Sequence, residues 1–245
     1  MLGDRCWRIE ITRTKQSTIT QHLTPNTHIM TEIDSQFLLL INGFHTDYLD
    51  RLMWLISGKL VWIPFYIMTL FAIYKKRGWK GALHALILVG VMMLLTDMLN
   101  SQVIRPWFHR LRPTNLENPL SQYVHIVNDY RGGSYSFPSI HAANYWGLSL
   151  LVAYFMKSKR VLYSLFLLSL IVCYSRSYLG VHYPGDLLGG IIYSTIVVGA
   201  IIWTYQKYLP KASVPEVRKC PILIDWIPAI SVLVTLMVFT IVAAF

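Results

Sequence analysis

Charged residues are scarce in this chain of 245 residues: Asp, Glu, Lys and Arg make up 14% of it, whereas soluble domains carry about 25%. Hydrophobic residues make up 54%, and the mean hydropathy is +0.45. A chain of this composition places much of its surface in lipid, which excludes a free cytosolic enzyme, a disordered tail and a secreted scaffold. Cysteine is scarce as well: Cys6, Cys173 and Cys220 form no Cys-x-x-Cys pair and indicate neither a disulfide framework nor a zinc site.

Three motifs of well-known catalytic sites are also absent. The sequence has no Gly-x-Ser-x-Gly elbow, no Walker A loop and no His-Glu-x-x-His helix. Lys and Arg (22) outnumber Asp and Glu (12), which gives a net charge of +10. Because these basic residues fall in short clusters between apolar runs, they indicate membrane topology, and nucleic acid is not expected as a partner.

Six apolar runs come close to the roughly 20 residues that cross a bilayer. They predict an all-α fold, a polytopic membrane helical bundle of about six transmembrane helices, at 52–74, 82–104, 138–156, 161–181, 187–205 and 226–245. One membrane domain, 30–245, accounts for these spans. Residues 1–29 are polar and are predicted to be a disordered extension, with Met30 as an alternative start. The segment 33–41 is predicted to be an amphipathic helix at the membrane interface.

Basic residues cluster in three of the connections between spans. They are Lys75, Lys76, Arg77 and Lys80, then Lys157, Lys159 and Arg160, and then Lys207, Lys211, Arg218 and Lys219. Positive loops remain in the cytoplasm, so these three connections are predicted to lie inside. The long loop 105–137 and the short turn at His182 are then predicted to face outward.

Polar residues suited to phosphate chemistry stand at the outward ends of the spans, in three groups. In chain order these are Arg105 with Arg112-Pro113, then Pro138-Ser139-Ile140-His141, and then Ser175-Arg176 with His182 and Asp186. If the groups converge, the three arginines supply permanent positive charges with forked donors that suit phosphate oxygens. Ser139 is placed to cap a helix whose free amides also attract an anion. Such a phosphate site needs no metal.

The two histidines of these groups suit different steps. Asp186 follows His182 by four residues, and its carboxylate could accept from one ring nitrogen and leave the other free to attack phosphorus. His141 could protonate the leaving oxygen. Other interpretations stay open. Histidines and arginines at span ends also bind headgroups. His182 and Asp186 could be two metal ligands, although no Glu or Cys nearby completes such a set.

Together the three groups resemble the signature of the phosphatidic acid phosphatase type 2 superfamily: Lys-x6-Arg-Pro, Pro-Ser-Gly-His and Ser-Arg-x5-His-x3-Asp. The third block matches at every defined position. In the first block Arg105 replaces lysine, which keeps the charge but adds a planar fork. In the second block Ile140 replaces glycine, which is tolerated if this position is the first turn of a helix rather than a backbone of positive φ.

The resemblance implies a role for each matched residue. It makes His182 the nucleophile, Asp186 the residue that orients it and His141 the general acid. It assigns phosphate binding to Arg105, Arg112, Ser139 and Arg176. It also implies a hydrolase that forms a phosphohistidine and uses no metal or other cofactor. The related vanadate-dependent haloperoxidases are soluble, so this apolar chain is not expected to share their activity.

A site of this kind at the bilayer surface predicts an integral membrane lipid phosphatase. Its candidate substrates are polyprenyl pyrophosphate, lipid A, phosphatidic acid and phosphatidylglycerol phosphate. The resemblance places the protein in the inner membrane of a bacterium, with the active site on the periplasmic face. The loop 114–137 is predicted to cover the site, with His125, Tyr130 and Arg131 contacting the substrate beyond its phosphate.

Two other functions compete with the phosphatase. A non-catalytic lipid-phosphate binder or lipid transporter would use the same arginines but would not require His182 and Asp186. A channel would place ionisable residues along a path through the bilayer, whereas Asp97 is almost alone within the predicted spans. The intact pair of His182 and Asp186 favours the phosphatase.

Overall fold

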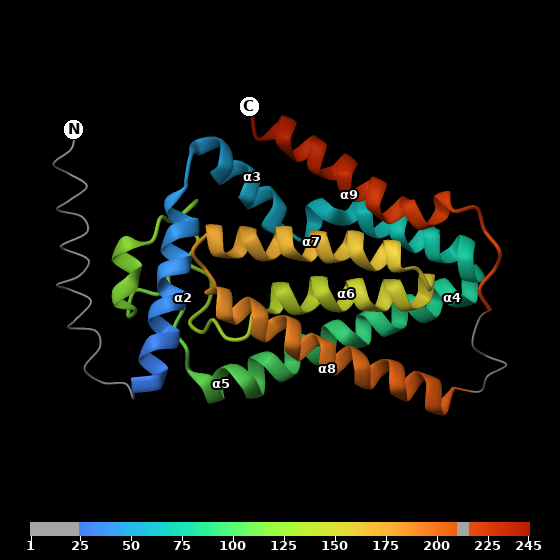
Figure 1. The fold of residues 1–245 in the computed structure, drawn as a ribbon, viewed down its shortest axis with the longest axis horizontal. Helices are drawn as coiled ribbons and strands as arrows, with labels where there is room; N and C mark the ends of the chain where they lie inside the picture. The colour runs from blue at the N-terminus through green and yellow to red at the C-terminus, as the bar shows by residue number, and fades with distance from the viewer. Residues whose placement is uncertain (1–24, 210–215) are drawn as a thin grey trace.

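The computed structural model describes residues 25–209 and 216–245, and these residues form helices joined by loops, without a β-strand (Figure 1). The prediction of a disordered extension therefore lies largely outside the described residues, and its last five residues begin a helix. The elements are α2 (Pro25–Gly43), α3 (Asp47–Ser57), η2 (Leu60–Trp62), α4 (Ile63–Leu99), η3 (Asn100–Ile104), α5 (Arg105–Phe108), η4 (Pro119–Tyr123), α6 (Ile140–Met156), α7 (Lys159–Tyr178), α8 (Pro184–Tyr208) and α9 (Leu223–Val242).

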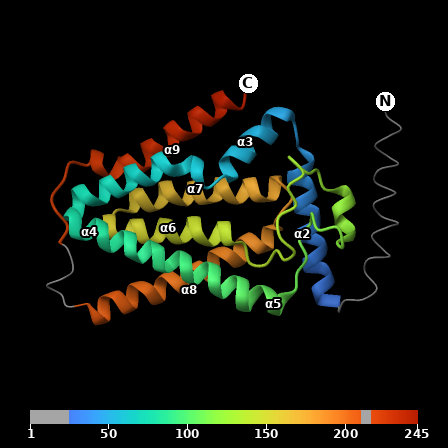
Figure 2. The same ribbon diagram turned by 180° about the vertical axis from the view of Figure 1, so that it is seen from behind.

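Helix α4 is folded into two arms. Gly78 inside it has φ 69° and ψ −176°, a conformation that favours glycine, and the helix breaks there. An added Cβ at Gly78 would also lie 2.6 Å from a guanidinium nitrogen of Arg218. The arms on either side of Gly78 run back along the bundle in opposite directions (Figures 1 and 2).

The described residues contain four helical stretches long and apolar enough to cross a membrane. They are Leu60–Phe108, Lys159–Tyr178, Pro184–Tyr208 and Leu223–Val242. The first has 49 residues and contains both arms of α4, whereas α6, with 17 residues, is too short to be included. With the two arms and α6, the bundle has about six membrane-spanning segments, which confirms the predicted all-α membrane fold.

The predicted start of the first span is wrong. The apolar run was expected to begin at residue 52, but α3 ends at Ser57 and the backbone of Gly58 is extended, with φ −67° and ψ 141°. The membrane-spanning stretch therefore begins at Leu60. Hydropathy is averaged over a window of residues. The predicted span therefore included the apolar residues of α3 together with those of the next helix, and the break between the two helices was not detected.

Helix α6 lies in the centre of the bundle and packs against α4, α7 and α8. Small residues allow this close packing, and Gly190 on α8 is the clearest example. An added Cβ at Gly190 would lie 2.4 Å from the carbonyl oxygen of Ser139. The backbone N–H of Ser139 also donates to the carbonyl oxygen of Asp186 at 3.0 Å. Close packing thus joins the first turns of α6 and α8, where two of the three predicted motifs lie.

The two ends of the bundle carry different structures. At one end α2 lies across the bundle together with η4 and the loop that follows α5 (Figures 1 and 2). The opposite end holds the turn at Gly78, the turn from α6 to α7, the C-terminal end of α8 and the residues 216–222 that precede α9 (Figure 1). Apart from Lys211, which lies outside the described residues, the predicted basic clusters fall at this opposite end, so the described basic residues of all three connections lie on the same side of the bundle. On α2, Leu38 is buried while Phe37 and Leu40 are exposed, as an interfacial helix requires.

Candidate active site

His182 lies in the short connection between α7 and α8 and is fully buried. Its Nε2 lies 3.3 Å from Nη1 of Arg112, and its Nδ1 lies 3.5 Å from Oδ2 of Asp186. Arginine is only a donor, so Nε2 must be the ring nitrogen that accepts, and the network therefore assigns the ring proton to Nδ1. His182 thus presents a lone pair on Nε2 to the arginine side of the site.

Asp186 is fixed at the start of α8 by contacts from two directions. Its Oδ2 accepts from the backbone N–H of Tyr183 at 2.9 Å, and its Oδ1 accepts from Nη1 of Arg110 at 2.8 Å. The distance of 3.5 Å to His182 exceeds that of a normal hydrogen bond, and catalytic contacts of this kind often tighten only when substrate binds. The carboxylate is therefore held beside the ring that it is predicted to orient.

Arg110 is a site residue that the sequence analysis missed. Besides Asp186 it binds Asp34 on α2, with Nη2 2.5 Å from Oδ2, and its guanidinium stacks 4.1 Å from the ring centre of Tyr183. Asp34 also accepts from the backbone N–H of Gly185 at 2.7 Å. Through these contacts α2 holds the start of α8. Only the basic composition around Arg105 and Arg112 hinted at Arg110, and its partner Asp34 is 76 residues away.

The three predicted phosphate-binding arginines come together around His182. Arg112 donates to the carbonyl oxygens of Tyr135 and Val181, each at 3.1 Å. Arg176 is 3% exposed and donates to the hydroxyl of Ser57. Nε of Arg105 and Nε of Arg176 are buried and have no hydrogen-bond partner among the described residues. Buried donors without partners are costly, so this part of the site is arranged to receive an acceptor such as a phosphate oxygen.

Ser139 and His141 stand at the start of α6. Ser139 is the N-cap residue, and its side chain accepts from the N–H of Ala142, although the distance of 3.5 Å is long. Ile140 is the first residue of the helix and is not among the residues of positive φ. The replacement of glycine by Ile140 therefore requires no unusual backbone. His141 lies within electrostatic range of His182, Arg112 and Arg176.

Burial and positive charge together keep the nucleophile candidate neutral. Burial, and after it the charges of Arg112, Arg176 and Arg105, lower the pKa of His182 well below the usual 6.5. Burial and the other two arginines also lower the pKa of Arg112 to about 10, which leaves it charged at neutral pH. The site therefore combines a neutral imidazole with persistent positive charge, as required for binding and attacking a phosphate dianion.

The loop 114–137 contributes one of its three predicted contact residues to the site. The hydroxyl of Tyr130 lies 3.5 Å from Nη2 of Arg176. Arg131 donates to the carbonyl oxygen of Thr114 at 2.9 Å and so ties the loop to itself. Nε2 of His125 lies 2.8 Å from Asp50 on α3, and contact of Arg131 and His125 with substrate stays a prediction.

The arrangement can bind a tetrahedral anion between the arginines and bring a nucleophilic nitrogen to it. A metal site built on His182 and Asp186 would need further ligands, and the described residues contain no group of three His, Cys, Asp or Glu side chains that could hold one. The geometry suits a phosphate site, with the imidazole of His182 beside the arginines and that of His141 within electrostatic range of it.

Comparisons with known proteins agree with this geometry. The model of the PAP2 superfamily matches residues 85–210. The lipid A 4'-phosphatase of Bacteroides thetaiotaomicron is 38% identical over 163 residues, which are 66% of this chain and 72% of that protein. The lipid A 4'-phosphatase of Porphyromonas gingivalis is 33% identical over 190 residues, 78% of this chain and 79% of that protein.

A solved structure shares the fold. It is the crystal structure of the first transmembrane PAP2 type phosphatidylglycerolphosphate phosphatase from Bacillus subtilis, and it aligns with a TM-score of 0.55 and 22% identity. The alignment covers 80% of this chain and 92% of that chain.

Proposed function

The chain belongs to the PAP2 superfamily and is an integral membrane hydrolase of lipid phosphates, and from this premise we propose that it removes the 4'-phosphate of lipid A. The lipid A 4'-phosphatases of two bacteria, each similar over about two thirds of this chain or more, support this substrate. The observation that carries the mechanism is the position of buried His182, with Arg112 on one side of the ring and Asp186 on the other.

The phosphate binds first, between the guanidinium groups of Arg105, Arg112 and Arg176 and the helix start capped by Ser139. The unpartnered Nε atoms of Arg105 and Arg176 support this placement because a phosphate oxygen would satisfy them. Buried arginines also stabilise the charge that spreads over the phosphoryl oxygens during transfer. They take the electrostatic role that a metal ion fills in other phosphatases, so the reaction proceeds without one.

His182 then attacks phosphorus with the lone pair on Nε2. The bond from phosphorus to the ester oxygen breaks, and the protonated form of His141, which the negative charge of the bound phosphate stabilises, donates a proton to that oxygen as the alcohol leaves. Asp186 stabilises the positive charge on the His182 ring through Nδ1–H. Water next attacks the phosphohistidine and passes a proton to His141, which releases inorganic phosphate and restores both histidines.

The site lies on the outer, periplasmic face of the inner membrane. The clustering of basic connections at the end of the bundle away from His182 supports this orientation, because positive loops remain in the cytoplasm. A lipid substrate then keeps its acyl chains in the outer leaflet while its phosphate enters at headgroup level.

Phosphate release by the purified protein in detergent tests the proposal. The substrates are lipid A, phosphatidic acid, phosphatidylglycerol phosphate and polyprenyl pyrophosphate, each with a chelator present. We expect release from lipid A, with mass spectrometry locating the loss at the 4' position. The variant His182→Ala should lose turnover below detection, while the control His84→Ala, a histidine that contacts Tyr205 instead, should retain it.

Each part of the proposal has its own contrary result. Release from another lipid but not from lipid A would overturn the substrate. Turnover by His182→Ala would overturn the nucleophile, and loss of activity with the chelator would overturn the metal-independent reaction. No release from any lipid would favour a lipid-phosphate binder or transporter, which a lipid-exchange assay would then detect.

A further inference from the structure

A cavity adjoins the candidate active site on the side of His141. It has a volume of about 290 Å³ and is lined by residues of both arms of α4 and of α6, together with Lys59 and Leu60 just before α4. The ones with polar groups are Lys59, Tyr66, Asp97, His141, Asn144 and Tyr145. Since His141 is proposed to protonate the leaving oxygen, the groups that share a cavity with it face the alcohol part of the substrate.

Asp97 is an unusual residue in this cavity. It lies inside the membrane-spanning stretch Leu60–Phe108, where a carboxylate is costly and commonly marks a functional site. The hydrogen bond that its side chain makes within the described residues comes from Nδ2 of Asn144, and at 3.4 Å it is long. Asn144 is held in turn by Thr96, whose hydroxyl donates to Oδ1 of Asn144 at 2.7 Å. A carboxylate offers about four acceptor positions, so Asp97 can still accept from a ligand.

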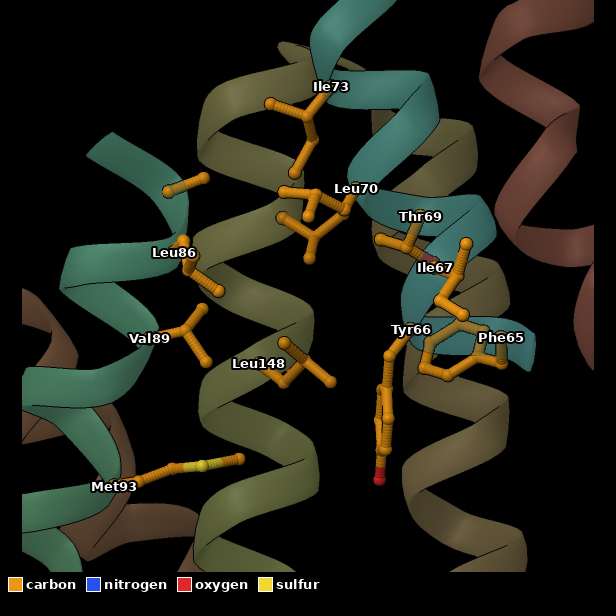
Figure 3. A pocket seen from close by; sticks show the side chains of 12 residues that line it. Phe65, Tyr66, Ile67, Thr69, Leu70, Ile73, Leu86, Val89, Met93 and Leu148 are labelled. Atoms are coloured by element: carbon orange, nitrogen blue, oxygen red, sulfur yellow. The ribbon is translucent and has the colours of Figure 1, made fainter. Parts of the chain in front are cut away.

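The cavity continues into an apolar groove between the two arms of α4. Tyr66, Met93 and Leu148 line both spaces. The groove has a volume of about 280 Å³, and its other lining residues are almost all apolar (Figure 3). In Figure 3 the hydroxyl of Tyr66 points away from Ile73, which lies nearer to the turn at Gly78. A polar compartment beside His141 thus leads directly into a space suited to an acyl chain.

We propose that the cavity beside His141 binds the alcohol part of the substrate as an acylated sugar, with Asp97 and Asn144 recognising its hydroxyl and amide groups. This inference rests on the proposed function and deepens it by assigning the residues that select the lipid. An acylated amino sugar supplies the donors that Asp97 lacks, and its acyl chain continues into the groove. Polyprenyl phosphates and phosphatidic acid bring no such donor, so they leave the free acceptor positions of Asp97 without a ligand partner, which disfavours their binding relative to an amino sugar.

Two inhibitors separate this cavity from the phosphate site. Vanadate mimics phosphate and binds only between the arginines. The reaction product, lipid A without its 4'-phosphate, binds only in the cavity beside His141. In Asp97→Ala we expect KM for lipid A and the inhibition constant of the product each to rise about tenfold or more. The inhibition constant of vanadate should change less than twofold. Asp97→Asn keeps one acceptor and should give an intermediate rise.

The control is Glu117→Gln, which changes an exposed acid on the loop after α5 and should alter none of these constants. Equal weakening of product and vanadate in Asp97→Ala would overturn the inference, because it would indicate general damage to the site. Unchanged product binding would overturn it as well. Failure of the wild-type protein to hydrolyse lipid A would overturn the proposed function, and with it the sugar assignment. The two failures are therefore distinguished by which protein shows them.

Discussion

Two buried arginines at opposite ends of the bundle show how the same side chain serves different purposes. Arg77, beside the turn at Gly78, is 7% exposed and donates from Nε to the carbonyl oxygen of Phe155 at 2.6 Å, at the end of α6. Arg176, at the end of α7, is 3% exposed, yet its Nε has no hydrogen-bond partner among the described residues. A helix leaves carbonyl groups free at its C-terminus, so Arg77 satisfies the backbone. Arg176 keeps a donor for a ligand.

The difference extends to the surroundings of each arginine. Arg77 is the buried member of a basic cluster at one end, where Lys76 pairs with Asp225 of α9 at 2.5 Å. Arg176 shares its surroundings with Arg105, Arg112 and His182. Like charges gathered in a buried site repel one another, and an anion removes that repulsion. Burial of an arginine is therefore not a sign of function by itself, and unsatisfied donors close to other cations are the better sign.

After the loss of His182 itself, the largest effect is expected from a change that leaves every cation in place. Asp186→Asn removes the carboxylate beside Nδ1 of His182 but keeps the shape of the side chain. The ring then loses the group that fixes its tautomer, and turnover of lipid A should fall about 10³-fold to 10⁴-fold. Initial rates of phosphate release in detergent measure this, with Glu117→Gln as the control acid. A rate within threefold of wild type would remove Asp186 from the mechanism.

The two arginines themselves give the next largest effect and test the comparison directly. Arg176→Lys keeps the charge but loses the planar fork, so turnover should fall about 10²-fold while the fold remains. Arg77→Lys should leave turnover per folded molecule unchanged. It should instead lower the free energy of unfolding by about 1.5–3 kcal/mol through the lost bonds to the α6 carbonyls. Phosphate release and thermal unfolding in detergent are measured on both variants.

The contrast between Arg77 and Arg176 would be contradicted if Arg77→Lys lowered turnover or if Arg176→Lys left turnover unchanged. Loss of turnover without loss of stability in Arg77→Lys would give both ends of the bundle a part in catalysis. Wild-type turnover in Arg176→Lys would show that charge alone suffices at this position, and the unpartnered Nε would then have no special meaning.

Much of this fold and site could be predicted from the sequence, because hydrophobic runs and motif spacing are local features. The apolar runs correspond to helices of the bundle, and the motif residues meet around His182 at one end of it in the structure. The start of the first span was wrong because Gly58 interrupts a run that hydropathy treats as continuous. The folding of α4 at Gly78 places the two arms beside each other, but no local pattern revealed that a groove would lie between them.

The remaining site contacts depend on residues far apart in the chain. Arg110 reaches Asp34 on α2, and nothing in the residues around Asp34 marks it as part of a phosphate site. Arg131 and His125 were predicted to contact substrate because they lie in a polar loop close to the motifs. In the structure they bind Thr114 and Asp50, which hold the loop in place. Polar composition identifies such a loop but does not show which side chains turn inward.

The last and smallest prediction is that the His182 ring does not become protonated near neutral pH. It tests whether the neighbouring arginines lower the pKa of this ring. Protonation of His182 would add a charge to a buried site that already holds Arg105, Arg112 and Arg176, and burial together with these charges lowers its pKa well below 6.5. A group with a lowered pKa becomes protonated only as the pH falls through that lower value. We therefore expect the His182 ring to remain neutral as the pH falls from 8 through 6.5, where a free imidazole becomes half protonated, with its proton on Nδ1. Nitrogen-15 spectra of histidine-labelled protein report both properties, and the His182 signals are identified by their loss in His182→Ala.

Two results would contradict this prediction. Titration of His182 with a midpoint near 6.5 would show that the arginines do not act on the ring. A proton on Nε2 would leave no lone pair facing the phosphate site.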